Sequence, residues 1–510
     1  QAGLDLEMPY SGGYNDRQIV KAVQEGRLDE AVLDEAVERV LNVVFAGEEQ
    51  HRPEDISDKE TDHKKAADIE TECAVLLENN GILPLNTDRK VAYIGEFAEK
   101  PRYQGGGSSH INPFRVVSAL DAAGEKGRSV TYAKGFSNEN DSMTEQELEK
   151  ALRTAAEADV AVIFAGLPEI FESEGYDRTS MKLPKCQDRL IEEVLKVQPN
   201  VVVVLHNGSP VELPWADRVS AILEMYLGGQ GVGEACDRLL FGEANPSGRL
   251  AETFPYRLED NPSFLHFPGN GKRVLYGEDI FVGYRYYDTK KVPVRYAFGH
   301  GLSYTEFTYG DLTLSSAQMT DEDILTVSLK VKNSGKTEGK EVVQLYVADL
   351  CGISERPVKE LKGFAKVHLL PGEEKTVSME ISARNLSYYE ERLGDWYAPS
   401  GTYRILIGHA SDDIRLHADV VFETKKKLPL RVDFTTTFGE LLDHTKTAPV
   451  ITELLAPLAA AAASAEGMSD EYKKLGEQVI REMPLKSLLG QMPGEQVEQL
   501  IGQLNCLLAQ

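Results

Sequence analysis

Four runs of apolar residues constrain the fold of this chain more than any other feature of its sequence. The runs are nearly continuous rather than alternating, and they lie at residues 91–95, 160–165, 201–205 and 221–225. Parallel strands that helices cover on both faces are apolar on both faces, so they read as continuous apolar runs. The four runs therefore predict buried strands of a largely parallel sheet.

Segments with helical periodicity precede or separate these runs. They are expected to form helices over residues 64–79, 145–158 and 185–197. Strands that alternate with helices are typical of a parallel sheet with helices on both sides. The sequence therefore predicts an α/β sandwich domain over residues 63–265.

Alternation of apolar and polar residues marks the segment that follows. It occurs at residues 325–333, 341–348, 375–381 and 402–408. A period of two is the pattern of a strand with one buried face and one exposed face. A second domain, a β-sandwich over residues 311–425, is expected.

Aromatic residues are dense between the two predicted domains. Nine of them lie between Tyr276 and Phe307, mostly within an expected connection over residues 266–310. They indicate either a packed belt between the domains or a surface on which sugar rings stack. Both interpretations stay open at this point.

Both ends of the chain are helical in pattern. Residues 1–47 combine a short strand or loop with an apolar stripe at helical spacing, and an acidic linker over residues 48–62 follows. This segment is too small to enclose a core, so we expect it to pack on a further part of the protein. Residues 426–510 form a helical extension with a second stripe, made of Val497, Leu500, Ile501, Leu504 and Leu508. That stripe is expected to dock on its own chain or on a second subunit.

Composition narrows the classes of partner. The chain has 510 residues, of which 42% are hydrophobic and 27% charged, and its formal net charge is −27. This length predicts about three globular domains at roughly 150 residues each. Such an acidic surface repels nucleic acid and anionic membranes, so neither partner is expected and a neutral or cationic ligand is favoured. The apolar runs are far shorter than the ~20 residues of a membrane span.

The cysteines lie at wide and irregular intervals. There are five of them, Cys73, Cys186, Cys236, Cys351 and Cys506. An odd number without paired spacing argues against a disulfide framework and against a structural zinc site. We expect five free thiols, most of them buried, in a cytoplasmic protein that carries no metal or other cofactor.

The sharpest chemical feature is an acidic loop at residues 171–178, directly after the run 160–165. It contains four ionisable residues, which are Glu172, Glu174, Asp177 and Arg178. The loop lies at the carboxyl end of a predicted strand, where open α/β sheets bind ligands. Two neighbouring aromatic rings can desolvate a carboxyl and raise its pKa toward the range of a general acid. The alternative is a solvated acidic loop without catalytic function.

A glycine-rich loop at residues 104–110 is the second candidate. It matches neither the dinucleotide-binding pattern G-x-G-x-x-G nor the lysine-containing phosphate loop. We expect it to present the hydroxyls of Ser108 and Ser109 and an amide to a neutral ligand. His206, after the run 201–205, is interpreted as a hydrogen-bonded core histidine rather than as a catalyst.

Seven motifs give the chain a resemblance to a known family. In chain order they are Ala2–Pro9 (AGLDLEMP), Ala74–Leu85 (AVLLENNGILPL), Gln104–Asn112 (QGGGSSHIN), Glu172–Pro184 (ESEGYDRTSMKLP), Gly242–Glu252 (GEANPSGRLAE), Ile280–Asp288 (IFVGYRYYD) and Tyr296–Tyr304 (YAFGHGLSY). Over residues 1–425 the chain closely resembles glycoside hydrolase family 3 enzymes, particularly bacterial β-glucosidases. The resemblance implies a (β/α)8 barrel, an α/β sandwich and a fibronectin type III-like domain. Residues 1–47 would be the C-terminal end of that barrel.

The resemblance also implies a mechanism. A retaining glycosidase uses two carboxyl groups about 5–5.5 Å apart, one as nucleophile and one as general acid/base. The acid/base of the family corresponds to Glu174 here. The family's nucleophile is an aspartate on the barrel, located before the first motif, so it is expected outside residues 1–510. Asp5 and Glu7 are not candidates for that role.

The expected function is therefore that of the C-terminal part of an exo-acting β-glucosidase. Its substrates would be β-glucosides or oligosaccharides with a terminal non-reducing β-D-glucosyl residue, and residues 1–510 alone would be inactive. A β-xylosidase or arabinosidase of the same family stays open, as does a non-catalytic carbohydrate-binding or interaction unit. A homo-oligomer formed through the C-terminal helices also stays open.

Overall fold

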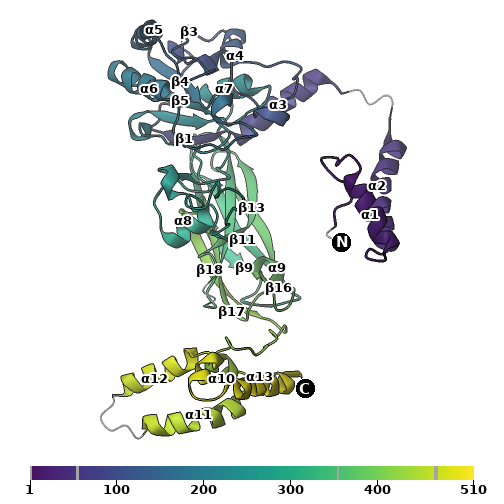
Figure 1. Cartoon of the computed structure of the whole chain (residues 1–510). Coiled ribbons are helices and arrows are strands. Elements are labelled where there is room, and N and C mark those ends of the chain that lie inside the picture. The colour runs from purple at the N-terminus through teal and green to yellow at the C-terminus, as the bar shows by residue number, and fades with distance from the viewer. Residues whose placement is uncertain (1–2, 53–56, 353–354, 464–468, 510) are drawn as a thin grey trace.

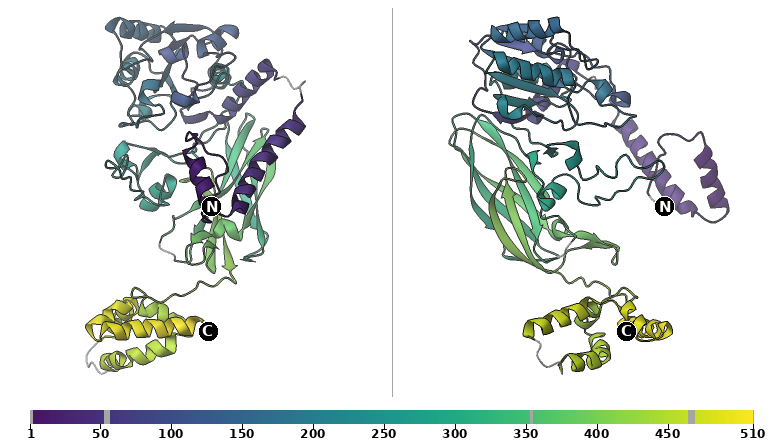
Figure 2. Two further views of the ribbon diagram at one scale, coloured as in Figure 1. Left: turned by 45° about the vertical axis from the view of Figure 1, so that its right-hand side comes forward. Right: turned by 60° about the vertical axis from the view of Figure 1, so that its left-hand side comes forward.

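The computed structural model describes residues 3–52, 57–352, 355–463 and 469–509. An α/β domain, a β-sandwich and a helical unit follow one another along the molecule, and the helices α1 and α2 stand beside this row (Figure 1). Two further views show the same succession (Figure 2). The two predicted domain types are thus present in the predicted order.

A six-stranded sheet forms the centre of the α/β domain. Its strand order is β1-β6-β5-β4-β2-β3, and every neighbouring pair is parallel except β1 with β6. The strands are β1 (Val75–Asn79), β2 (Val91–Ile94), β3 (Val130–Ala133), β4 (Val160–Gly166), β5 (Val201–His206) and β6 (Ala221–Glu224). Every residue of β2, β4 and β5 is buried. This burial is the physical reason for the continuous apolar runs, and the largely parallel sheet is confirmed.

Helices pack around this sheet in two groups. In one group α3 and α4 each contact α7, and in the other α5 contacts α6. Their bounds are α3 (Lys59–Cys73), α4 (Ala119–Glu125), α5 (Glu145–Ala156), α6 (Lys185–Val197) and α7 (Val232–Leu240). The prediction of one helix over residues 64–79 is wrong, because its last part is the edge strand β1. Pairing with β6 determines that conformation, and a local periodicity does not reveal a distant partner.

The β-sandwich has one sheet of five strands and one of three. Their orders are β10-β18-β17-β12-β13 and β14-β11-β9. The strands are β9 (Phe307–Leu314), β10 (Gln318–Thr320), β11 (Ile324–Asn333), β12 (Gly339–Asp349), β13 (Glu360–Leu369), β14 (Glu374–Ser382), β17 (Gly401–Gly408) and β18 (Ile414–Glu423). A helical turn α9 (Ala383–Leu386) and a hairpin of β15 (Tyr388–Glu390) and β16 (Asp395–Tyr397) complete it. In β11, alternate residues such as Leu325 and Val327 are buried, as the alternation predicted.

The aromatic connection is partly packed and partly exposed. It contains β7 (Phe254–Pro255), α8 (Tyr284–Lys290) and β8 (Val294–Tyr296). The ring of Tyr284 stacks on Phe298 at a centroid distance of 4.6 Å and meets Tyr346 of the sandwich edge-on at 5.9 Å. Tyr276, in contrast, is 80% exposed. Packing between the domains therefore accounts for part of the aromatic cluster.

Short 3-10 helices occur at several loops and turns. They are η1 (Glu96–Ala98), η2 (Gly107–Ser109), η3 (Glu169–Phe171), η4 (Ala216–Arg218), η5 (Leu258–Asp260) and η6 (Leu485–Gly490). The first three follow β2 and β4 and belong to the candidate site described below.

The C-terminal residues form a helical unit with its own core. The helices are α10 (Phe438–Asp443), α11 (Ala448–Ala463), α12 (Asp470–Glu482) and α13 (Gly494–Ala509). Val497 and Leu504 of the predicted stripe are fully buried and belong to one cluster with Phe438, Leu441 and Ile451. The stripe on α13 therefore docks on its own chain.

The N-terminal helices contribute to no such core. They are α1 (Tyr14–Gln24) and α2 (Glu30–Gln50), and within the described part of the chain neither has a buried residue. Residues 3–13 form no strand in the described structure, and Asp5 accepts two hydrogen bonds from the guanidinium of Arg39 at 2.7 and 2.8 Å. Helix α2 also extends to Gln50, into the segment that was expected to be a linker.

Among the described residues, no helix has the length and apolar character that spanning a bilayer requires.

The state of the cysteines agrees only in part with the sequence prediction. All five cysteines are free, as expected, but only Cys186 and Cys236 are buried. Cys73 and Cys506 are exposed, so the expectation that most of the thiols are buried is wrong.

Candidate active site

The two loops singled out in the sequence meet at the carboxyl edge of the central sheet. The glycine-rich loop follows β2 and contains η2, and the acidic loop follows β4 and η3. Strands β2 and β4 are parallel neighbours, so the segments that leave their carboxyl ends start side by side. The order of the strands thus brings together residues 66 positions apart in the sequence.

Backbone contacts join the loops at Glu174. The amide of Ser108 donates a hydrogen bond of 2.6 Å to Oε2 of Glu174, and the amide of Glu174 donates one of 3.4 Å to the carbonyl of Gly106. A Cβ on Gly107, whose φ is +86°, would lie 2.6 Å from the Cβ of Glu174. The loop therefore requires glycine at residue 107 both for its backbone conformation and for space.

The two serines have different roles in this arrangement. Ser108 reaches Glu174 through its backbone amide, whereas the hydroxyl of Ser109 donates to the carbonyl of Gly106 within its own loop at 3.3 Å. Both residues are exposed. An amide of this loop thus binds a carboxylate of the same chain, and its contribution to a neutral ligand stays a prediction.

Glu174 itself is exposed, and hydrogen bonding to Ser108 lowers its pKa below the usual range. The expectation that neighbouring aromatic rings raise this pKa is wrong. Tyr176 is half-exposed, and its hydroxyl donates to the carbonyl of Glu169 at 2.9 Å. Because the ring is held by Glu169, it does not remove water from the carboxyl of Glu174.

Glu172, two residues earlier, has the opposite environment. Its Oε2 accepts a bond of 2.7 Å from Arg102 and another of 2.7 Å from the amide of Gly208, while Oε1 accepts from the hydroxyl of Ser209. Arg178 lies 3.5 Å away as a second cation. Burial alone would raise the pKa of Glu172, but these hydrogen bonds and the charge of Arg102 outweigh it and the pKa is lowered. Both oxygens of Glu172 are engaged inside the protein.

Sequence reasoning missed the residues that hold Glu172. Arg102 follows β2, and Gly208 with Ser209 follows β5, so they lie at the same edge of the sheet. Arg102 also donates 2.7 Å and 2.9 Å bonds to the carbonyls of Glu172 and Leu167. Their position directly after predicted strands was the available signal, although it does not say which side chain they contact.

Buried polar groups extend from this edge into the domain. Glu224, at the end of β6, accepts from Asn207 at 3.0 Å, and Glu252 accepts from Tyr226 at 3.0 Å. Burial raises the pKa of Glu252 to about 7. His206 is buried as expected, and burial lowers its pKa to about 4. The expected hydrogen bond is absent, since neither ring nitrogen has a partner among the residues that the structure describes.

No candidate metal centre emerges from the part of the chain that the structure describes, because no three His, Cys, Asp or Glu side chains there lie together as ligands. The candidate site consists of an exposed carboxylate, Glu174, on a loop that is held by ionic contacts of the partly buried Glu172. Such a carboxylate can exchange a proton with a bound ligand.

Two family models match this chain. The model for the glycosyl hydrolase family 3 C-terminal domain matches residues 74–304. The model for a fibronectin type III-like domain matches residues 341–411. The first match contains both loops of the candidate site.

Curated proteins and solved structures agree with these models. A thermostable beta-glucosidase B of Acetivibrio thermocellus is 46% identical over 99% of this chain and 67% of its own length. An exo-alpha-(1->6)-L-arabinopyranosidase of Bifidobacterium breve is 38% identical over 100% of this chain and 66% of its own length. The crystal structure of a Bifidobacterium adolescentis GH3 beta-glucosidase superposes with a TM-score of 0.81, at 38% identity over 88% of this chain and 66% of that one. The chain thus spans about two thirds of the length of these relatives.

Proposed function

The chain belongs to glycoside hydrolase family 3, and we propose that it contributes the general acid/base, Glu174, to a retaining glycosidase. The observation that supports this role is the contrast within the acidic loop. Glu172 is engaged by Arg102, Gly208 and Ser209, whereas Glu174 keeps an exposed carboxylate. Of these two glutamates, Glu174 is the one that a glycosidic oxygen can reach.

In the proposed reaction Glu174 acts twice. As an acid it gives its proton to the glycosidic oxygen while a nucleophilic carboxylate attacks the anomeric carbon, and a glycosyl-enzyme forms. As a base the resulting carboxylate then takes a proton from the water that hydrolyses this intermediate. We place the nucleophile, an aspartate, outside residues 1–510. Asp5 and Glu7 are not proposed for this role, because the family's nucleophile is expected before the motif Ala2–Pro9 that contains them.

The first step needs a protonated Glu174, although hydrogen bonding to Ser108 lowers its pKa in the chain as described. We propose that the completed site reverses this shift. A second carboxylate at about 5–5.5 Å disfavours ionisation of the first, and a bound sugar that excludes water acts in the same direction. After the nucleophile is glycosylated its charge is gone, so Glu174 returns to the ionised form that the second step needs.

For the substrate we propose terminal non-reducing β-D-glucosyl residues of glucosides or oligosaccharides, since relatives named as beta-glucosidases include the one at 46% identity. The arabinopyranosidase at 38% identity supports a second candidate, a terminal arabinosyl residue. A panel of aryl glycosides that includes β-D-glucoside, β-D-xyloside and α-L-arabinopyranoside separates these substrates by kcat/KM.

The decisive experiment is Glu174→Gln in the full-length protein that contains this chain. We expect hydrolysis of substrates with poor leaving groups to slow by roughly 10²–10⁴-fold, because they need a proton to depart. Substrates with activated aryl leaving groups need little protonation, so their first step should survive. The glycosyl-enzyme should then accumulate, and added azide should restore turnover and give a β-glycosyl azide.

Asp177→Asn is the matched control, since Asp177 is an exposed carboxylate of the same loop. It should keep the wild-type dependence on the leaving group. Azide rescue in Asp177→Asn but not in Glu174→Gln would show that the acid/base is Asp177 and that the assignment to Glu174 is wrong. The chain of residues 1–510 alone should release no nitrophenol from aryl glucosides, and steady release by the purified chain would refute the placement of the nucleophile. In that case a carboxylate within residues 1–510 acts as nucleophile.

A further inference from the structure

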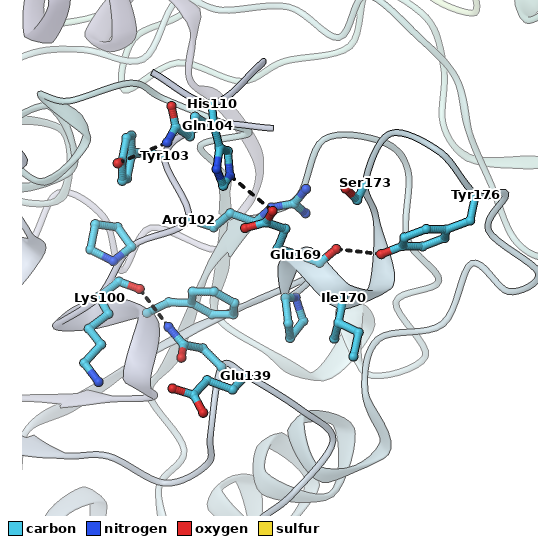
Figure 3. Close-up of a pocket in the computed structure, with 14 residues that line it drawn as sticks. Lys100, Arg102, Tyr103, Gln104, His110, Glu139, Glu169, Ile170, Ser173 and Tyr176 are labelled. Carbon is cyan, nitrogen blue, oxygen red and sulfur yellow. Dashed lines mark hydrogen bonds and ion pairs between the residues drawn. The ribbon is translucent and has the colours of Figure 1, made fainter. Parts of the chain in front are cut away.

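An open pocket of about 600 Å³ lies beside the acidic loop (Figure 3). Its walls come from the segments that leave β2, β3 and β4. Residues 97–104 follow β2, Asn138 and Glu139 follow β3, and residues 168–170 follow β4. A volume of this size falls within the range of about 300–1,000 Å³ that is typical of small-molecule sites.

The topology of the sheet identifies this place as a binding crevice. From β2 the chain moves to β3 at one edge, and it then returns to β4 on the other side of β2 and continues to β5 and β6. The direction of winding therefore reverses between β2 and β4. Open α/β sheets bind ligands outside the carboxyl ends of the strands at this point. The pocket lies there, and no role proposed so far uses it.

The charges of the lining residues favour a neutral ligand. Each basic side chain already faces a carboxylate, with Lys100 at 3.1 Å from Glu96, Arg102 at 2.7 Å from Glu172 and His110 at 3.1 Å from Glu169. A phosphate or another anion would have to compete with these carboxylates for the same cations. A neutral ligand leaves the three pairs intact.

The remaining lining groups suit a polyhydroxylated ring. The side chains of Gln104 and Asn138 and the carboxylate of Glu139 offer donors and acceptors for hydroxyl groups. Phe97, Pro101 and Ile170 supply apolar walls for the C–H faces of such a ring. Apolar walls with a few directed polar groups are the usual composition of a small-molecule site.

We propose that this pocket binds a neutral pyranose ring. The site stands on its own geometry and does not depend on the acid/base role of Glu174. It is nevertheless coupled to Glu174 in space, because Ser173 and Tyr176, which flank that residue in the loop, line the pocket. In Figure 3 both side chains lie on the same side of the pocket as Glu169. The ring comes either from the leaving group of a substrate or from a free saccharide.

The first test measures binding of methyl β-D-glucopyranoside and of cellobiose to residues 1–510, by saturation-transfer NMR and calorimetry. Ile170→Trp fills the pocket with a larger side chain, and because Ile170 is 65% exposed the substitution leaves the core intact. We expect it to weaken binding by at least tenfold, which corresponds to about 1.4 kcal/mol. Glu139→Ala, which removes a polar group of the wall, should weaken binding to a smaller extent.

Val197→Trp is the matched control. Val197 is 43% exposed at the end of α6, before β5 begins, and therefore lies toward the opposite edge of the sheet. It should bind both saccharides as the wild type does. Failure of the wild type to bind either saccharide overturns the proposal, and so does unchanged binding in Ile170→Trp.

Kinetics of the full-length protein then separate the two sources of the ring. If the ring is a leaving group, Ile170→Trp should lower kcat/KM for cellobiose far more than for an aryl glucoside. If it is a free saccharide, binding is lost while the ratio of the two kcat/KM values stays unchanged. Glu174→Gln should retain saccharide binding by the pocket in either case, so a failure of the proposed catalytic role and a failure of the pocket give different results.

Discussion

The acidic loop contains two glutamates that differ in exposure and in the number of their partners. Its stem consists of Glu172 with Arg102, Arg178 and Ser209. Arg102 is buried and the other three are partly buried, and both carboxylate oxygens of Glu172 accept hydrogen bonds. Its tip consists of Glu174 with Gly107 and Ser108, and it is exposed, with one short hydrogen bond to the carboxylate.

The difference indicates that Glu172 anchors the loop, whereas Glu174 is available to a ligand. A buried carboxylate costs free energy to desolvate, and its partners repay that cost only when each oxygen is satisfied. Glu172 meets this condition and anchors the loop to the ends of β2 and β5. The carboxylate of Glu174 accepts one hydrogen bond, from the amide of Ser108, and stays exposed. Substitutions in the stem and in the tip test whether the two regions are independent.

The largest effect on stability is expected for Glu172→Ala. Removal of this carboxylate leaves the buried Arg102 and the partly buried Arg178 without their anionic partner, and breaking a buried pair in this way typically costs about 3–5 kcal/mol. Denaturation followed through the fluorescence of Trp215, which is fully buried in the same domain, measures this loss. Glu174→Ala is the control and should leave the transition unchanged. Equal destabilisation by both variants would abolish the distinction between stem and tip.

A smaller effect is expected for Gly107→Ala at the tip. The new Cβ would meet the Cβ of Glu174 at 2.6 Å, and the φ of +86° is unfavourable for alanine. We expect a loss of about 1–3 kcal/mol in stability from the strained backbone. Displacement of Glu174 by about 1 Å should also reduce kcat/KM of the full-length protein by up to about 100-fold.

Gly81→Ala separates strain from displacement in that experiment. Gly81 has a φ of +99°, and a Cβ there would meet nothing within 4 Å among the described residues. It should therefore destabilise the domain by a similar amount without changing kcat/KM. If Gly81→Ala and Gly107→Ala lower activity equally, contact with Glu174 is not the cause.

The smallest effect is a dependence on pH at the stem. The folded state lowers the pKa of Glu172, whereas in the unfolded chain a glutamate titrates near 4.3. The ionised form therefore stabilises the fold fully above about pH 4.3, and this contribution disappears as the pH falls through the lower pKa of the folded state. Glu172→Gln cannot titrate, so its deficit in Tm relative to wild type should be largest near pH 7 and should shrink toward pH 3. A deficit that stays constant over this range would mean that the charge of Glu172 does not stabilise the stem.

Periodicity allowed much of the fold to be predicted, because it is a local property. The burial of β2, β4 and β5 on both faces and the alternation in β11 follow directly from which residues are apolar. Strand β1 was missed because its apolar residues continue directly from α3, and only its pairing with β6 distinguishes a strand from a further helical turn. β3 was missed because it is short and mostly half-exposed.

For the candidate site, sequence identified the loop but not its environment. Glu174 follows from the resemblance to glycoside hydrolase family 3, and the place of the loop after β4 follows from the strand pattern. The predicted direction of the shift in its pKa was wrong, because the shift depends on where the ring of Tyr176 points and on the amide of Ser108, 66 positions away. Arg102 and Ser209 could not be assigned, because the sequence does not show that β2 and β5 end at the same carboxylate.

The amphipathic stripes at the two ends of the chain show the same division. Sequence by itself determined that α2 and α13 each carry an apolar face, since that depends only on residue spacing along a helix. Only the tertiary structure decided that α13 contacts η6 and buries its face in a core shared with α10 and α11, whereas no residue of α2 is buried among the residues described. The reason is that the apolar area of a stripe sets how much free energy its burial can contribute. Whether the stripe is buried depends on which distant segments pack against it.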